Sequence, residues 1–204
     1  GDLEGAAYAF LSSLEQQHDD QLAFDTANIL MRQERYTEAI DIYRSIAGGS
    51  PLALQRDYNL AEAMIATGRF EDAATILGDY LMRNPGDRDA LYNYAAALLK
   101  SGDYMGAADT FSRLRESSPR DVRLAYNLGL AYQHLDAMDQ SIENLSYAAE
   151  NNPDNPQYLY ALAVSLARNG EQCEAVTYMQ KALQYNPGLN AARTWLEAVS
   201  QNEE

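Results

Sequence analysis

The sequence is poor in the residues that usually build a catalytic or metal centre. It contains one cysteine, Cys173, and two histidines, His18 and His134, which are far apart in the chain. Neither histidine has a second histidine or a cysteine at ligand spacing. No HExxH motif, phosphate-binding glycine-rich loop or Ca²⁺ loop is present. We therefore expect a protein that is not an enzyme and that needs no metal or other cofactor.

Long apolar runs and positive charge are also scarce. No apolar stretch approaches the ~20 residues of a membrane span, which argues against direct membrane insertion. The formal net charge is −15 and the isoelectric point is near 4.4. Phosphate backbones and anionic lipids are bound by clustered Lys and Arg, so this composition argues against nucleic acid and membrane surfaces as partners. A single cysteine also excludes an internal disulfide.

The sequence does contain a repeat of fixed length. The pattern that starts at Ala125-Tyr126-Asn127-Leu128-Gly129 recurs in steps of 34 residues at Asp57, Leu91 and Leu159, with a weaker copy around Phe24. A fixed period in this range is typical of a stacked array of helical repeats. We therefore expect one elongated domain whose core runs from each repeat into the next.

Each repeat predicts two helices. The first ends at a residue type that suits a helix C-terminus, in the column Glu34, Gly68, Gly102, Asp136 and Gly170. The second is ended by a proline, in the column Pro51, Pro85, Pro119, Pro153 and Pro187. Small residues recur where the two helices would cross, in the columns Ala27, Ala61, Ala95, Gly129, Ala163 and Ala39, Ala73, Ala107, Ser141, Ala175. Bulk at these positions would push the helix axes apart.

These columns resemble the tetratricopeptide repeat family, whose unit has a small residue on each helix, an aromatic residue near the turn and a terminal proline. The resemblance implies an all-α fold, a right-handed α-solenoid of antiparallel helix pairs, in a single domain over residues 1–204. We expect five repeats, at 20–53, 54–87, 88–121, 122–155 and 156–189. Met138 and Gln172 replace the turn aromatic in the last two repeats, which predicts looser packing there.

The two ends of the chain differ from the repeat pattern. Residues 1–17 are similar to a second helix whose partner is missing, so we expect an N-terminal half repeat there. Residues 189–200 predict a further first helix with Trp195, Leu196 and Val199 toward the array. Because Glu197 falls where the other repeats have Ala or Gly, a second helix should not pack closely against it. We therefore expect a C-terminal capping helix and a frayed tail at 202–204.

In this family the first helices line a concave groove, so the resemblance implies which columns face a ligand. The predicted groove residues are Asn28, Asn59, Asn93, Asn127, Tyr58, Tyr92, Tyr126, Tyr160, Lys100, Arg123 and Arg168. An amide is both donor and acceptor, so Asn59, Asn93 and Asn127 in register could pair with any extended peptide backbone. The alternative is that these amides bond neighbouring helices, and that the tyrosines are ordinary packing between first helices.

Two further inferences concern the bound segment. A related use of the fold grips a C-terminal carboxylate with Lys and Arg, but the corresponding positions hold Phe24, Tyr58, Tyr92 and Asn93, which excludes that mode. Acidic residues lie in the early groove positions and basic residues in the late ones. This predicts a peptide whose basic portion lies toward Asp25 and whose acidic portion lies toward Arg168.

The main hypothesis is a non-catalytic protein-interaction scaffold that binds an extended segment of roughly ten to fifteen residues. One alternative is a spacer or self-association segment of a longer array, and another is the substrate-holding arm of an enzyme. Arginine is far more frequent than lysine and no eukaryote-specific feature is present, which favours a bacterial source. There, such arrays serve envelope assembly, secretion or polysaccharide export, in the cytoplasm or the periplasm.

Overall fold

The structure is a computed structural model that describes residues 3–201, and for residues 3–15, 17 and 18 it describes the backbone only. The described residues form eleven α-helices and no strand. They fall into two compact units, which divide between Ser101 and Gly102. Each unit is described by itself.

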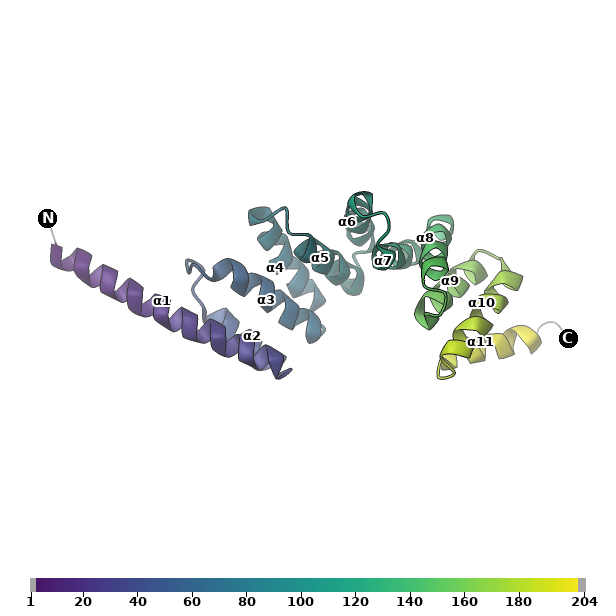
Figure 1. Cartoon of the computed structure of the whole chain (residues 1–204), viewed down its shortest axis with the longest axis horizontal. Coiled ribbons are helices and arrows are strands. Elements are labelled where there is room, and N and C mark those ends of the chain that lie inside the picture. Colours follow the sequence, from purple (N-terminus) through teal and green to yellow (C-terminus); the bar gives the residue numbers. More distant parts are fainter. Residues whose placement is uncertain (1–2, 202–204) are drawn as a thin grey trace. The chain divides into compact units, whose positions relative to one another are not determined.

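The first unit contains five helices. They are α1 (Leu3–Arg32), α2 (Tyr36–Ser45), α3 (Ala53–Ala66), α4 (Phe70–Arg83) and α5 (Arg88–Ser101). Each helix packs against the next one, and α3 also contacts both α1 and α5 (Figure 1). The first helices of successive repeats, α1, α3 and α5, therefore line up as neighbours.

The second unit contains six helices. They are α6 (Tyr104–Ser117), α7 (Val122–His134), α8 (Met138–Asn151), α9 (Pro156–Arg168), α10 (Gln172–Tyr185) and α11 (Asn190–Gln201). Each packs against the next, and α7 also contacts α9. The predicted all-α architecture of stacked helix pairs is confirmed.

The helix ends follow from the residues that the period places there. Gly68 and Gly170 adopt φ of 76° and 87° after the first helices, a left-handed conformation that suits glycine. Glu34 and Asp136 adopt the same conformation, with φ of 60° and 61°. The residues before the closing prolines leave the helical region, with φ and ψ of −138° and 66° at Asn84, −142° and 67° at Ser118, and −147° and 68° at Asn152.

The predicted crossing residues are fully buried. Ala27, Ala61, Ala95 and Ala163 are 0 % exposed, as are Ala39, Ala73, Ala107, Ser141 and Ala175. The crossing at Gly129 is tight, because a Cβ added there would lie 2.6 Å from Leu145 Cγ. The small-residue columns are therefore a steric requirement, and at Gly129 even a methyl group does not fit.

The structure differs from the prediction near the N-terminus. A half repeat ending at residue 17 and a new helix from residue 20 were expected, but α1 runs without a break over 30 residues. The segment 15–20 contains neither glycine nor proline, so nothing in it stops a helix. Conversely, α2 ends at Ser45, earlier than expected, because Gly48, Gly49 and Pro51 follow it.

The last helix packs as a cap. Trp195 and Leu196 contact a small cluster of Ala163, Met179 and Ala192, while Glu197 is exposed. The predicted loose corner is wrong at Met138, which is only 8 % exposed, whereas Gln172 at the corresponding place in the last repeat is exposed. The predicted frayed tail lies outside the described residues.

Candidate functional site

The polar face of the first unit is organised around Asn28 on α1. Its side-chain oxygen accepts hydrogen bonds from the Tyr43 hydroxyl at 2.6 Å and from Asn59 Nδ2 at 2.8 Å. Asn59 lies on α3, so this bond joins two neighbouring first helices. It is the contact between helices that the alternative interpretation of the asparagine column predicted.

Tyr58 and Asn93 form the next link on this face. Asn93 Nδ2, on α5, donates to the Tyr58 hydroxyl on α3 at 3.2 Å. The Tyr58 ring packs against the Tyr80 ring with their centroids 5.7 Å apart. Tyr58, Asn59 and Asn93 are all half-buried. The three predicted asparagines of the first unit, Asn28, Asn59 and Asn93, are therefore held in place by side chains of adjacent helices.

Glu62 is an acidic group in the same place, one turn after Tyr58 on α3. Burial raises the pKa of Glu62, the nearby Asp89 carboxylate raises it further, and a hydrogen bond with Tyr58 opposes them. Burial likewise raises the pKa of Tyr58, and the negative charge of Glu62 adds to the effect. The first-helix face of this unit is thus polar, partly desolvated and acidic.

The remaining predicted residues of the first unit are more peripheral. Tyr92 is half-buried on α5, and Lys100 is exposed at the end of that helix. Asp25 is exposed on α1 and accepts a hydrogen bond from Gln21 Nε2 at 3.2 Å.

The corresponding face of the second unit is largely apolar. Tyr126 packs against Tyr158 with ring centroids 4.5 Å apart, and burial raises its pKa. Tyr160 is half-buried and packs against both hydrophobic clusters of this unit. Asn127 is half-buried on α7, whereas Ala161 takes its place on α9. These tyrosines pack between helices, as the alternative interpretation predicted.

The two predicted arginines of the second unit are already paired. Arg168 donates to the Gln133 carbonyl at 2.7 Å and to Asp136 Oδ1 at 2.9 Å, and so ties α9 to the turn after α7. Arg123 Nη2 lies 3.0 Å from Asp121 Oδ2. Both pairs lie at the surface.

Two polar networks were not predicted from the sequence. The buried Ser141 hydroxyl donates to the Gly129 carbonyl at 2.8 Å and lies 2.8 Å from Ser165 Oγ, which accepts from Gln133 Nε2 at 2.7 Å. In the first unit, Tyr43 bonds Asn28. Both networks could have been found from a residue that breaks the pattern of its repeat position. Ser141 stands where the other repeats have alanine, and Tyr43 carries a hydroxyl where the other repeats have an apolar side chain.

Within residues 3–201, no group of three or more His, Cys, Asp or Glu side chains is placed to hold a metal ion. In the same part of the chain no helix is long and apolar enough to cross a membrane.

Stacked two-helix repeats of one length, with small residues at each crossing, define a helical-repeat protein of the kind that serves as an interaction scaffold. One family model described as tetratricopeptide repeat matches residues 30–97 and 73–129, and a second matches 1–53 and 138–190. The chain belongs to the tetratricopeptide repeat family.

Several solved structures share this fold. A structure of MamA, from residue 41 to the end, from Desulfovibrio magneticus RS-1 is 22% identical, with a TM-score of 0.76 over 84% of this chain and 97% of that chain. A structure of YrrB, described as a TPR protein with an unusual peptide-binding site, is 17% identical, with a TM-score of 0.75 over 93% and 98%. No curated protein of known function matches.

Proposed function

We propose that this protein is a non-catalytic scaffold that binds an extended segment of a partner protein along the first helices of its first unit. The observation that carries the proposal is the bonded series on the first unit, in which Asn28 accepts from Asn59 and Asn93 donates to Tyr58. An amide has two N–H groups and an oxygen with two lone pairs, so the internal bonds of Asn59 and Asn93 leave each of them capacity for a ligand.

The internal bonds favour this role. A side chain that is already held by its neighbours loses little further freedom when a ligand binds, so more of the interaction energy appears as affinity. The half-buried setting strengthens hydrogen bonds to a peptide backbone relative to a fully exposed site. YrrB, which shares the fold and is described as having a peptide-binding site, supports a peptide as the class of ligand.

The charges narrow the class of partner. Asp25, Glu62 and Asp89 give the first unit an acidic first-helix face. Arg123 and Arg168 are paired with Asp121 and Asp136, so they offer less to an acidic ligand than the sequence suggested. We therefore propose that the partner segment carries basic residues where it contacts the first unit. The acidic portion that the sequence predicted near Arg168 is not part of this proposal.

Selection from a library of random 12-residue peptides tests this proposal. The full chain is the target, and the affinity of a selected peptide is then measured by fluorescence anisotropy. Replacing Asn59 and Asn93 together by alanine should weaken binding by about fivefold or more, because each lost hydrogen bond is worth about 0.5–1.5 kcal/mol. A charge-reversed version of the peptide should bind more weakly to the original chain.

The matched control is Asn151→Ala. Asn151 is an exposed asparagine on α8 whose side chain bonds the Tyr147 carbonyl of its own helix. It should leave the peptide affinity unchanged. Unaltered binding by the double variant, with its helical circular dichroism intact, would show that the ligand does not use Asn59 and Asn93.

A further inference from the structure

The outer face of α1 exposes two large apolar side chains. Leu22 is 63 % exposed and Ile29 is 54 % exposed, and they lie seven residues apart on one side of the helix. Most of their counterparts at intervals of 34 residues are buried: Ala90, Leu124 and Tyr158 at 0 %, 2 % and 8 %, and Ala63, Ala97 and Ala131 at 0 %. Elsewhere in each unit, therefore, this face of a first helix is covered by the preceding helices.

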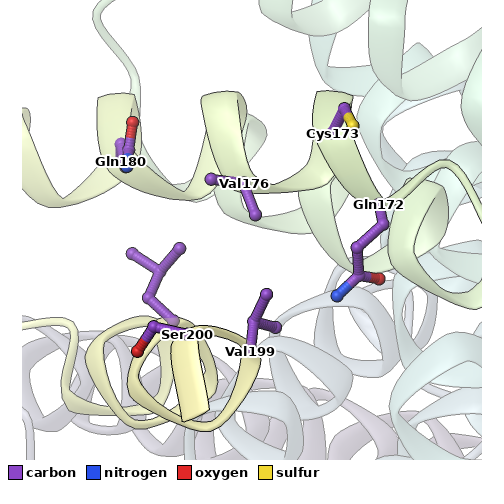
Figure 2. A pocket seen from close by; sticks show the side chains of 7 residues that line it. Gln172, Cys173, Val176, Gln180, Val199 and Ser200 are labelled. Carbon is purple, nitrogen blue, oxygen red and sulfur yellow. The ribbon is translucent and has the colours of Figure 1, made fainter. Parts of the chain in front are cut away.

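A second, partly exposed apolar surface lies between α10 and α11. A pocket of about 440 Å³ is lined by Val176 on α10 and by Leu196 and Val199 on α11. Figure 2 shows Val176 and Val199 projecting toward each other from the two helices. The rest of the lining is formed by Gln172, Cys173, Gln180 and Ser200, none of which is charged.

The residues of this pocket are also buried at equivalent positions inside the units. The counterparts of Val176 include Ile40, Ala74 and Ala108, which are 2 %, 7 % and 6 % exposed. The counterparts of Leu196 include Leu60, Leu128 and Leu162, which are 5 %, 5 % and 1 % exposed. At those positions another helix of the same unit covers the side chains. The pocket therefore corresponds to the surface that, at the equivalent positions inside each unit, is covered by a further helix.

We propose that the pocket between α10 and α11 binds α1 of a second copy of this chain, with Leu22 and Ile29 as its anchors. Two anchors seven residues apart are about 10 Å apart along a helix, and an amphipathic helix in an apolar groove is commonly held by anchors at this spacing. The contact continues the helix-on-helix packing that each unit already uses. It covers both exposed surfaces with a single interface.

The charges of the two surfaces agree with this pairing. The sequence of α1 contains five acidic residues against one cation, Arg32. The helices α10 and α11 carry Lys181 and Arg193 against Glu174 and Glu197, so they are neutral in a chain of net charge −15. The acidic helix thus meets a part of the protein that does not repel it. Because the two surfaces differ, the contact is heterologous, and repeated it yields chains or closed rings.

Sedimentation velocity of the full chain over a wide concentration range tests this inference. The original chain should show a concentration-dependent rise in mass. Ile29→Lys and Val199→Lys should each raise the dissociation constant by about tenfold or more, because each would bury an unpaired charge in an apolar contact. A 1:1 mixture of these two variants should form dimers and nothing larger, since each retains the surface that the other has lost.

Met82→Lys is the matched control, because Met82 is 77 % exposed on α4 and lies on neither surface. It adds the same positive charge to a strongly acidic chain and should leave the association unchanged. A mass of one chain at every concentration would overturn the proposal and leave the pocket to a different occupant. Equal weakening by Ile29→Lys, Val199→Lys and Met82→Lys, or no dimer in the mixture, would overturn it as well.

Discussion

The two units differ in where polar side chains bond to one another across helices. In the first unit, Asn28, Asn59 and Tyr58 lie on the face that the sequence assigns to the groove, and the crossings Ala27, Ala39, Ala61 and Ala73 hold only methyl groups. In the second unit, Ser141 and Ser165 are 0 % exposed and bond each other in the core, where Ser141 also bonds the Gly129 carbonyl.

This difference separates two uses of a hydrogen bond. A buried polar pair costs desolvation and fixes one packing arrangement, so the serine pair serves the fold of the second unit. A half-buried pair keeps access to solvent, so the asparagine series of the first unit remains available to a ligand. In the proposed function, repeats of the same length therefore bind the ligand in the first unit and stabilise the fold in the second.

The largest expected effect comes from breaking the tight crossing of the second unit. Gly129→Ala would place a methyl group 2.6 Å from Leu145 Cγ and should lower the free energy of unfolding by about 1–3 kcal/mol. Gly78→Ala is the control in the first unit, where an added Cβ lies 3.6 Å from Tyr94 Cε2. It should raise stability by about 0.5–1 kcal/mol, because alanine favours a helix interior.

Urea denaturation of both variants measures the difference. Equal and small changes in the two midpoints would mean that Leu145 moves aside freely, and that the crossing at Gly129 is not sterically tight.

The next largest effect concerns the first-helix face of the first unit. Asn28→Ala removes the acceptor shared by Asn59 Nδ2 and the Tyr43 hydroxyl. Because Tyr43 is 0 % exposed, its hydroxyl cannot turn fully to water, and stability should fall by about 1–2 kcal/mol. Thermal unfolding of this variant beside Asn151→Ala checks the expectation. If the two variants lost the same stability, Asn28 would not organise the face.

A smaller effect is expected from the serine pair of the second unit. Ser141→Ala restores the alanine found in the other repeats, but it leaves Ser165 with one partner fewer. The expected loss is about 1 kcal/mol, since Gln133 still satisfies Ser165. Ser146→Ala, a partly exposed serine on the same helix, is the control in urea denaturation. A gain in stability for Ser141→Ala would show that the hydrogen-bonded serine pair lowers the free energy of unfolding of the original chain.

The 34-residue period predicted the helix pairs and their crossings. The small residues, turn residues and prolines recur at fixed positions because each repeat imposes the same steric requirement there. The side-chain bonds could not be predicted in the same way. Whether Asn59 turns to Asn28 or to a ligand depends on the rotamer and on the hydroxyl of Tyr43, fifteen residues from Asn28 and on another helix. The continuous α1 was missed because a period predicts where helices repeat, but only glycine or proline reveals where one must stop.

The smallest expected effect is a dependence on pH at Glu62. Its pKa is raised above the ordinary value of 4.5, chiefly by burial, so the folded state binds the proton more tightly than the unfolded state does. Both states are protonated well below pH 4.5, and as the pH rises above that value the buried charge progressively destabilises the fold. Glu62→Gln should therefore stabilise the protein at about pH 7 by less than the changes above, because the side chain is half-exposed, and should have no effect at about pH 3.5.

Urea midpoints of both chains at the two pH values measure this, with Glu143→Gln, an exposed glutamate on α8, as the control. A stabilisation by Glu62→Gln that is equal at both pH values would mean that the charge of Glu62 is not its cause, and the acidic face of the first unit would then owe nothing to desolvation.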